Sequence, residues 1–234
     1  MNPVEDLPRV WPTIWLPGIN ERTRSTYWML ELDAMPPVLG ELDGSLAWLL
    51  ATPTHQPSLQ QGPDDPAERA ADGAGLEAVV PGLRLPAAFE RFIRDPEPRR
   101  HMRSATSCYL DLGHFATSFG DGRLIHVLSD QQGVLHWLLW AGADGSEAVV
   151  IAEAAVGFDL GDESVPRRLD ASAPEVALAV CADTFEQFLY RYWAMNELFY
   201  RLAVEKITPE ALPAELAAFA DAYPRARSDM EFFT

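Results

Sequence analysis

Residues 122–152 read GRLIHVLSDQQGVLHWLLWAGADGSEAVVIA, and this stretch decides the fold class. It contains three apolar runs suited to strands, separated by short turns with the sequences DQQG and ADG. The runs are residues 123–129, 134–140 and 147–152. Short strands joined by tight turns form an antiparallel meander, so the centre of the chain is predicted to be an antiparallel sheet. Because Trp137 and Trp140 are an odd number of residues apart, a regular strand would place them on opposite faces, so either both faces are covered or a bulge intervenes.

Two further elements are predicted directly before the meander. Residues 85–93 begin with Leu-Pro, which suits a first helical turn, and place Phe89, Phe92 and Ile93 on one helical face. Residues 106–112 are a candidate strand, and residues 120–122 form the turn that leads into the meander.

The strongest helical pattern follows the meander, at residues 184–206. Thr184 and Gln187 form a capping box, and aromatic residues then recur at helical spacing. We expect this helix to pack its aromatic stripe on the sheet. The stripe comprises Phe185, Phe188, Tyr192 and Phe199.

Helix, meander and helix in this order predict an α+β fold, a mostly antiparallel sheet flanked by helices with a long C-terminal helix. An N-terminal arm at residues 1–52 is expected to hold a strand at residues 26–32 and a short helix at residues 45–51, opened by a serine cap. The remaining divisions are a flexible loop at residues 53–75, a core at residues 76–206 and a helical extension at residues 207–234.

The chain of 234 residues is strongly acidic, with a formal net charge of −17. Such a field repels nucleic acid and anionic membranes and attracts basic partners. Between residues 104 and 165 there are nine acidic residues and one basic residue, Arg123. Within this acidic stretch and the loop that follows the meander we predict the partner-binding surface. Its candidate residues are Asp121, Asp130, Asp144, Asp159, Asp162 and Glu163.

No segment predicts secretion or membrane insertion. The first residues lack the basic region of a signal peptide, and the apolar stretch at residues 134–143 is too short to span a bilayer. We therefore expect a cytoplasmic protein. Cys108 and Cys181 lie in separate segments without a CxxC motif, and we expect two buried free thiols.

Catalytic and cofactor motifs are missing from the sequence. It contains no GxSxG elbow, no phosphate-binding loop and no compact metal motif, so we expect a protein that is not an enzyme and needs no cofactor or metal. One alternative remains open. His114, His126 and His136 lie on or beside the predicted meander, and His126 and His136 are placed to meet across one hairpin. A metal-binding protein or enzyme would use these two histidines together with nearby acids.

Four segments in order carry a resemblance to a known family. They are residues 82–93 (GLRLPAAFERFI), residues 103–109 (RSATSCY), residues 122–140 and residues 184–193 (TFEQFLYRYW) followed by Asn196-Glu197. This set resembles the SUKH superfamily, which includes the Smi/Knr-type fungal regulators of cell-wall synthesis. The resemblance covers about residues 83–202 and departs from the family at residues 94–100, where many members have a glycine-rich turn.

The resemblance implies a single α+β domain without catalytic activity. Bacterial members are commonly immunity proteins that bind and neutralise polymorphic toxins, often nucleases. The acidic composition is consistent with a basic toxin domain as the protein partner. The alternative within the same fold is a regulatory or scaffold protein with a cellular partner.

Overall fold

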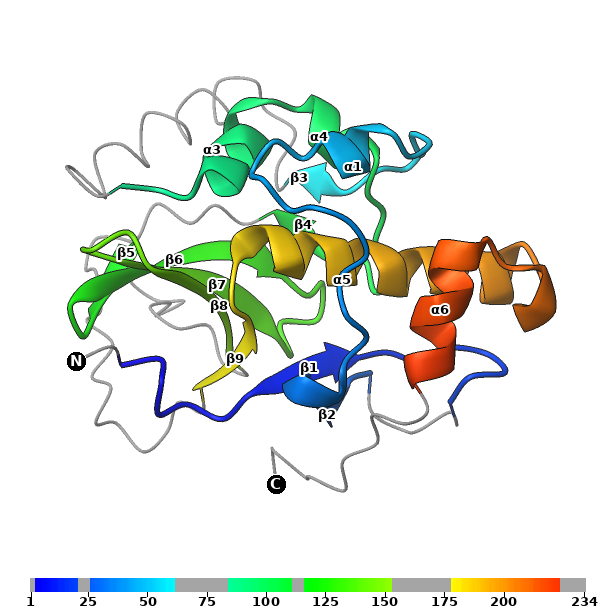
Figure 1. Ribbon diagram of the computed structural model, residues 1–234, viewed down its shortest axis with the longest axis horizontal. Helices are drawn as coiled ribbons and strands as arrows, with labels where there is room; N and C mark the ends of the chain where they lie inside the picture. The colour runs from blue at the N-terminus through cyan, green and yellow to red at the C-terminus, as the bar shows by residue number, and fades with distance from the viewer. Residues whose placement is uncertain (1–2, 21–25, 62–83, 111–115, 153–177, 224–234) are drawn as a thin grey trace.

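The computed structural model describes residues 3–20, 26–61, 84–110, 116–152 and 178–223 (Figure 1). Its larger sheet has seven strands in the order β3-β4-β6-β7-β8-β9, with β5 paired to β6. All pairings are antiparallel except β3 with β4, which confirms the predicted α+β class and its mostly antiparallel sheet. The strands are β3 Gln60–Gln61, β4 Tyr109–Leu110, β5 Ala116–Phe119, β6 Gly122–Ser129, β7 His136–Gly142, β8 Glu147–Ala152 and β9 Leu178–Ala182.

The predicted meander is confirmed as β6, β7 and β8, but two neighbouring strands differ from the prediction. β4 covers only part of the candidate strand at residues 106–112, of which residues 111 and 112 lie outside the described residues. β9 was not predicted, because its run LAVCA is short and no turn motif adjoins it. It adds to β8 and extends the buried sheet.

Both faces of β7 are covered, which is one of the two outcomes predicted from the spacing of its tryptophans. Trp137 is fully buried and its ring meets Tyr192 of the long helix edge-on, with 6.1 Å between centroids. Trp140, also buried, donates from its indole nitrogen to the carbonyl oxygen of Phe119 at 3.1 Å. A side chain at Gly122 would lie 2.7 Å from that indole nitrogen, so the close approach of Trp140 requires glycine there.

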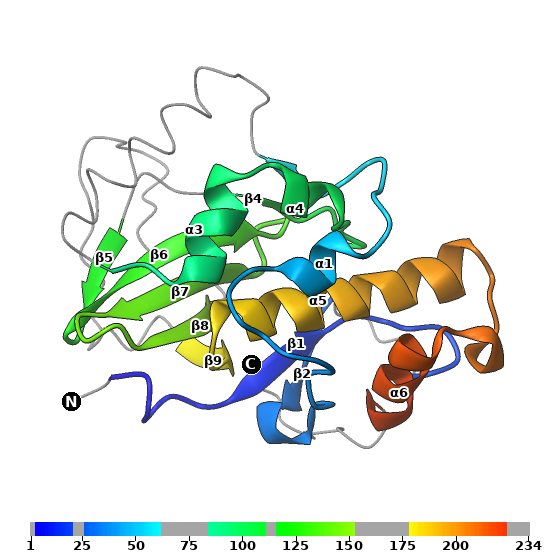
Figure 2. The same cartoon turned by 45° about the horizontal axis from the view of Figure 1, so that its top comes forward.

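The long helix α5 (Phe185–Phe199) lies between the sheet, the N-terminal strands and a layer of short helices (Figures 1 and 2). It continues into a π-helical turn, η2 (Tyr200–Val204), and thus ends close to the predicted boundary. Phe185 and Phe188 are buried, but their ring partners lie in α3 (Ala87–Arg94) and β1 (Val10–Thr13) as well as in α5 itself. Phe199 is only half-buried and its ring meets Tyr200, so its predicted place on the sheet is wrong.

Short helices complete the fold and largely match the predicted positions. α3 (Ala87–Arg94) begins after Pro86 as expected, and a second short helix, α4 (Glu97–Arg100), begins directly after Pro96 and contains Pro98. The described part of the C-terminal extension, residues 207–223, contains two short helical segments, in agreement with its predicted helical character. The helical segments other than α5 and η2 are η1 Leu32–Ala34, α1 Ala47–Leu50, α3 Ala87–Arg94, α4 Glu97–Arg100, η3 Pro209–Ala211 and α6 Ala214–Ala222.

The predicted division into an arm, a loop and a core does not describe the packing. β1 (Val10–Thr13) and β2 (Trp28–Glu31) form a two-stranded sheet, and Trp11 of β1 packs on Phe188 of α5. One continuous hydrophobic core runs from Val4 to Tyr223. The sequence suggested a separate arm because a polar stretch follows it, whereas apolar residues on both sides of that stretch pack together.

The predicted flexible loop at residues 53–75 is anchored over its described part, residues 53–61. His55 donates its backbone N–H to Arg100 at 2.8 Å, and Leu59 donates to Met102 at 2.7 Å. Leu59 is buried and β3 pairs with β4. This part of the predicted loop is therefore docked, and residues 62–75 lie outside the described residues.

Cys108 and Cys181 are both free and buried, as expected. Within the described ranges, no helix combines the length and the apolar composition that a membrane-spanning segment requires.

Candidate functional site

Two of the predicted partner-binding acids lie at the same end of the sheet. Asp121 occupies the β5–β6 turn and Asp144 the β7–β8 turn, and both are exposed. Strand register explains their proximity, because Gly122 of β6 pairs with Gly142 of β7 directly beside both turns. We call this the acidic end of the sheet, defined by Asp121 and Asp144.

Asp144 is held as a carboxylate in a fixed orientation. Its Oδ1 accepts hydrogen bonds from the hydroxyl and, at 2.9 Å, the backbone N–H of Ser146, and these bonds lower the pKa of Asp144. Asp144 and Gly145 also line a groove of about 490 Å³ between the β7–β8 turn and the start of α3. The other lining residues are Arg84, Leu85, Pro86, Ala87 and Glu90.

Asp130 does not belong to this surface, which corrects the prediction. It lies at the β6–β7 turn, at the opposite end of the same strands, and it is only 1% exposed. Its carboxylate accepts from the hydroxyl of Tyr27 and the backbone N–H of Gln132, each at 2.9 Å. A carboxylate this buried must be hydrogen-bonded within the protein, so Asp130 is not available to a partner. Asp159, Asp162 and Glu163 lie outside the described residues.

His126 and His136 meet as the hairpin register predicted. Both are buried, and the hydroxyl of Ser129 lies 3.1 Å from Nε2 of His126 and 2.9 Å from Nδ1 of His136. Their ring centroids are 5.3 Å apart. In the part of the chain that the structure describes, no group of three or more His, Cys, Asp or Glu residues is arranged to hold a metal ion. His114 lies outside that part.

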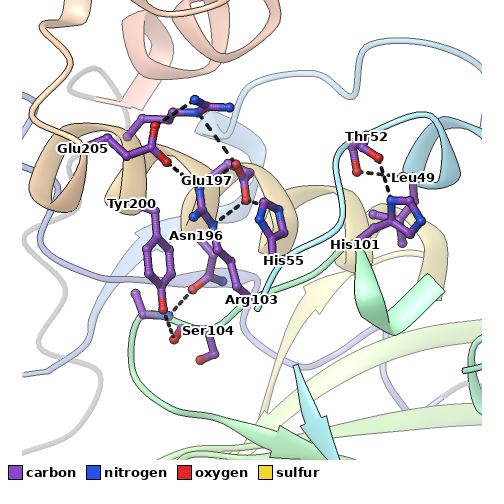
Figure 3. Close-up of polar contacts among 12 residues, drawn as sticks. Leu49, Thr52, His55, His101, Arg103, Ser104, Asn196, Glu197, Tyr200 and Glu205 are labelled. Atoms are coloured by element: carbon purple, nitrogen blue, oxygen red, sulfur yellow. Dashed lines mark hydrogen bonds and ion pairs between the residues drawn. The ribbon is translucent and has the colours of Figure 1, made fainter. Parts of the chain in front are cut away.

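A second polar cluster, which sequence reasoning missed, surrounds the C-terminal half of α5 (Figure 3). We call it the α5 hub, and Glu197 is its centre. Arg103 donates from Nε to Oε1 of Glu197 at 2.7 Å and from Nη2 to Oε2 at 2.9 Å, a bidentate pair. The Glu197 side chain is only 5% exposed, so this ion pair is shielded from solvent.

Other members of the α5 hub connect it to distant segments. Nε2 of His55 lies 2.9 Å from Oε1 of Glu197, at ion-pair distance but outside hydrogen-bond alignment. The Arg103 guanidinium stacks 4.0 Å from the ring centroid of Tyr200. Asn196 accepts from the backbone N–H of Ala105 at 2.6 Å. The hub thus holds the docked segment at residues 53–61 and the segment at residues 103–105 on one helix.

Electrostatics favour the ionised form of Glu197. Burial alone would raise the pKa of Glu197, but the contacts with His55 and Arg103 outweigh burial, so the pKa is lowered. A lowered folded-state pKa contributes stability that is present at neutral pH and is lost as pH falls through that pKa. The hub is therefore a buried ion-pair network that stabilises the fold at neutral pH.

The sequence contained only a weak signal for the hub. Asn196 and Glu197 interrupt the aromatic pattern of α5, and a polar pair inside an apolar helix indicates buried partners. The partners themselves lie far away, since Arg103 precedes Glu197 by 94 residues.

No protein-family model, curated protein or solved structure matches the chain.

Proposed function

We propose that the protein is a non-enzymatic binding protein of the cytoplasm that neutralises a basic toxin domain by direct contact. The observation that carries the proposal is the acidic end of the sheet, where Asp121 and Asp144 are exposed in two turns at the same end, in a chain of net charge −17. The resemblance to immunity proteins of the SUKH superfamily supports the same function.

Physical chemistry connects this charge to the function. A toxin that cuts nucleic acid is positively charged where it meets phosphates. An acidic protein competes for that surface and gains association rate through long-range attraction, by about 10- to 1000-fold at low salt. Exposed charges at the border of an interface act mainly on the association rate, whereas buried pairs act on dissociation.

The proposal predicts a salt-dependent association rate that depends on the acidic end. The first step is to search the genes beside this one for a basic toxin domain. The double variant Asp121→Asn and Asp144→Asn should bind that domain several-fold more slowly than wild type at low salt, with a smaller difference at high salt. The measurement is stopped-flow association at two ionic strengths. Denaturant melts of the variant check that the substitutions leave the fold intact, because Asp144 also accepts hydrogen bonds from Ser146.

A matched control variant also removes two negative charges, but from a surface away from the acidic end of the sheet. Glu210→Gln with Asp221→Asn changes two exposed acids near α6, which lies at the other side of the molecule in Figure 1. Equal slowing by both double variants would show that only net charge matters and that the acidic end is not the steering surface. A wild-type protein that neither binds nor neutralises the toxin domain would contradict the proposed function and favour a regulatory or scaffold role with another partner.

A further inference from the structure

The groove between the β7–β8 turn and the start of α3 combines apolar surface with charges of both signs. Its volume of about 490 Å³ lies within the range of about 300–1,000 Å³ that is typical of ligand sites. Its charged lining residues are Arg84, Glu90 and Asp144, and its apolar ones are Leu85, Pro86 and Ala87. Across the described ranges, none of the three charged groups forms an ion pair, even with one another. All three charges are therefore open to a ligand.

The two carboxylates of the groove can accept from a donor. Asp144 uses Oδ1 for both of its bonds from Ser146, which lower the pKa of Asp144 and leave Oδ2 for another donor. Glu90 is exposed in the first turn of α3. Two carboxylates in one groove attract a cationic group, and the net charge of −17 on the chain adds to that attraction.

Hydrogen-bond donors line the same groove. α3 begins at Ala87 without a side-chain cap, so the N–H groups of its first turn have no partners within the helix. The exposed guanidinium of Arg84 lies on the same groove. Donors alone would attract an anion, but the two carboxylates oppose a ligand that carries only negative charge. A ligand that fits the groove therefore combines a cation with a hydrogen-bond acceptor several atoms away.

We infer that the groove binds an arginine residue of a protein or peptide partner. The guanidinium of that arginine pairs with Asp144 and Glu90, because its planar fork matches carboxylates. Its aliphatic stem lies on Leu85 and Pro86, and its main-chain carbonyl oxygen accepts from Arg84. The inference rests on the proposed function for a partner that is basic, but not for a partner that is a toxin.

A short peptide tests the groove without a toxin. The probe is acetyl-Gly-Gly-Arg-Gly-Gly-amide, titrated into the full chain while backbone amide NMR shifts are recorded. Saturable shifts should concentrate at Ala87 and Gly145, which line the groove. A citrulline peptide, in which a neutral group of similar shape replaces the guanidinium, should not shift them. A lysine peptide should bind several-fold more weakly than the arginine peptide, because an ammonium group lacks the planar fork.

Variants of the two carboxylates test their role in binding. Glu90→Gln with Asp144→Asn should raise the dissociation constant of the arginine peptide about tenfold, because two exposed ion pairs are lost. Glu210→Gln with Asp221→Asn removes the same charge near α6 and should change the constant by less than about twofold. Thermal melts check that both double variants are folded.

Arg84 provides a test that depends on the sign of the change. If its guanidinium donates to the peptide carbonyl, Arg84→Gln should weaken binding about threefold. If Arg84 only repels the incoming cation, the same substitution should strengthen binding. Stronger binding would overturn the inference, because the acceptor of the ligand would then have no donor at Arg84.

The remaining outcomes separate this inference from the proposed function. Equal weakening by the two double variants, equal binding of the arginine and lysine peptides, or unshifted amides at Ala87 and Gly145 would overturn the inference. None of these results contradicts the proposed function, which depends on the association rate of the toxin domain and on Asp121. Specific binding of the arginine peptide without any binding of a toxin domain would support the groove and contradict the proposed function.

Discussion

The long helix formed by α5 and η2 has an apolar half and a polar half, which are held by opposite kinds of interaction. Residues 185–195 are surrounded by rings, with Phe185 against Phe89 at 5.0 Å between centroids and Phe188 against Trp11 at 6.3 Å. Residues 196–205 are held by charges and amides, with Glu197 and Arg103 at their centre. Apolar packing tolerates many partners of suitable size, whereas a buried ion pair requires particular partners in one geometry. Hydrophobic periodicity therefore predicts the packing of the first part of this helix. It does not predict the polar contacts of the second part.

The apolar half should give the largest effect. Phe188→Ala is expected to lower the unfolding free energy by about 3–5 kcal/mol, through lost transfer energy and the cavity left among Trp11, Phe185 and Tyr192. Denaturant melts measure the change. Phe199→Ala is the control on the same helix, and its half-buried ring should cost less than half as much. A loss below about 1 kcal/mol for Phe188→Ala would place its ring outside the core.

The polar half should give the next largest effect. Glu197→Gln should lower the unfolding free energy by about 3 kcal/mol at pH 7, because it leaves the buried Arg103 guanidinium with only the Glu205 carboxylate, 3.4 Å away and more exposed, as counter-charge. The difference from wild type should shrink as pH falls through the lowered pKa of Glu197, since protonated glutamate and glutamine are then alike. A difference that stays constant from pH 7 to pH 3 would show that lost packing, not lost charge, is responsible.

The smallest effect is expected at the N-terminus of α5, where half of the predicted capping box forms. The Thr184 hydroxyl accepts from the backbone N–H of Gln187 at 3.1 Å, but Oε1 of Gln187 has no hydrogen-bond partner, so the reciprocal bond is not made. Thr184→Ala should cost about 1 kcal/mol in thermal or denaturant melts, and Gln187→Ala almost nothing. Equal losses in the two variants would show that the box is reciprocal in solution.

The N-terminus of α5 also has a cap that no local motif indicates. Glu147 of β8 accepts from the backbone N–H of Phe185 at 2.9 Å. Burial raises the pKa of Glu147, with a smaller contribution from the nearby Glu186. Glu186 in turn accepts from the backbone N–H of Gly44 and the indole of Trp48, which docks the predicted N-terminal arm on α5. A sequence window around residue 185 contains none of these partners.

Elements with local signals can be predicted from the sequence. Alternating turns and apolar runs specify β6, β7 and β8, and helical spacing after Thr184 specifies α5, because turn chemistry and side-chain periodicity act over a few residues. The hairpins also place the two histidines on neighbouring strands and put Asp121 and Asp144 in turns at one end of the sheet. These features follow once the hairpins are recognised.

Only the tertiary structure decided which polar groups are buried and with whom. Asp130 has the same local sequence character as Asp144, a turn aspartate near a glycine, yet one is 1% exposed and the other lies fully on the surface. The difference comes from Tyr27, which reaches Asp130 from 103 residues away. Glu197 likewise depends on Arg103 and His55, and the N-terminal strands depend on Trp11 meeting Phe188. Such contacts arise because burial depends on the packing of the whole chain, which no local pattern encodes.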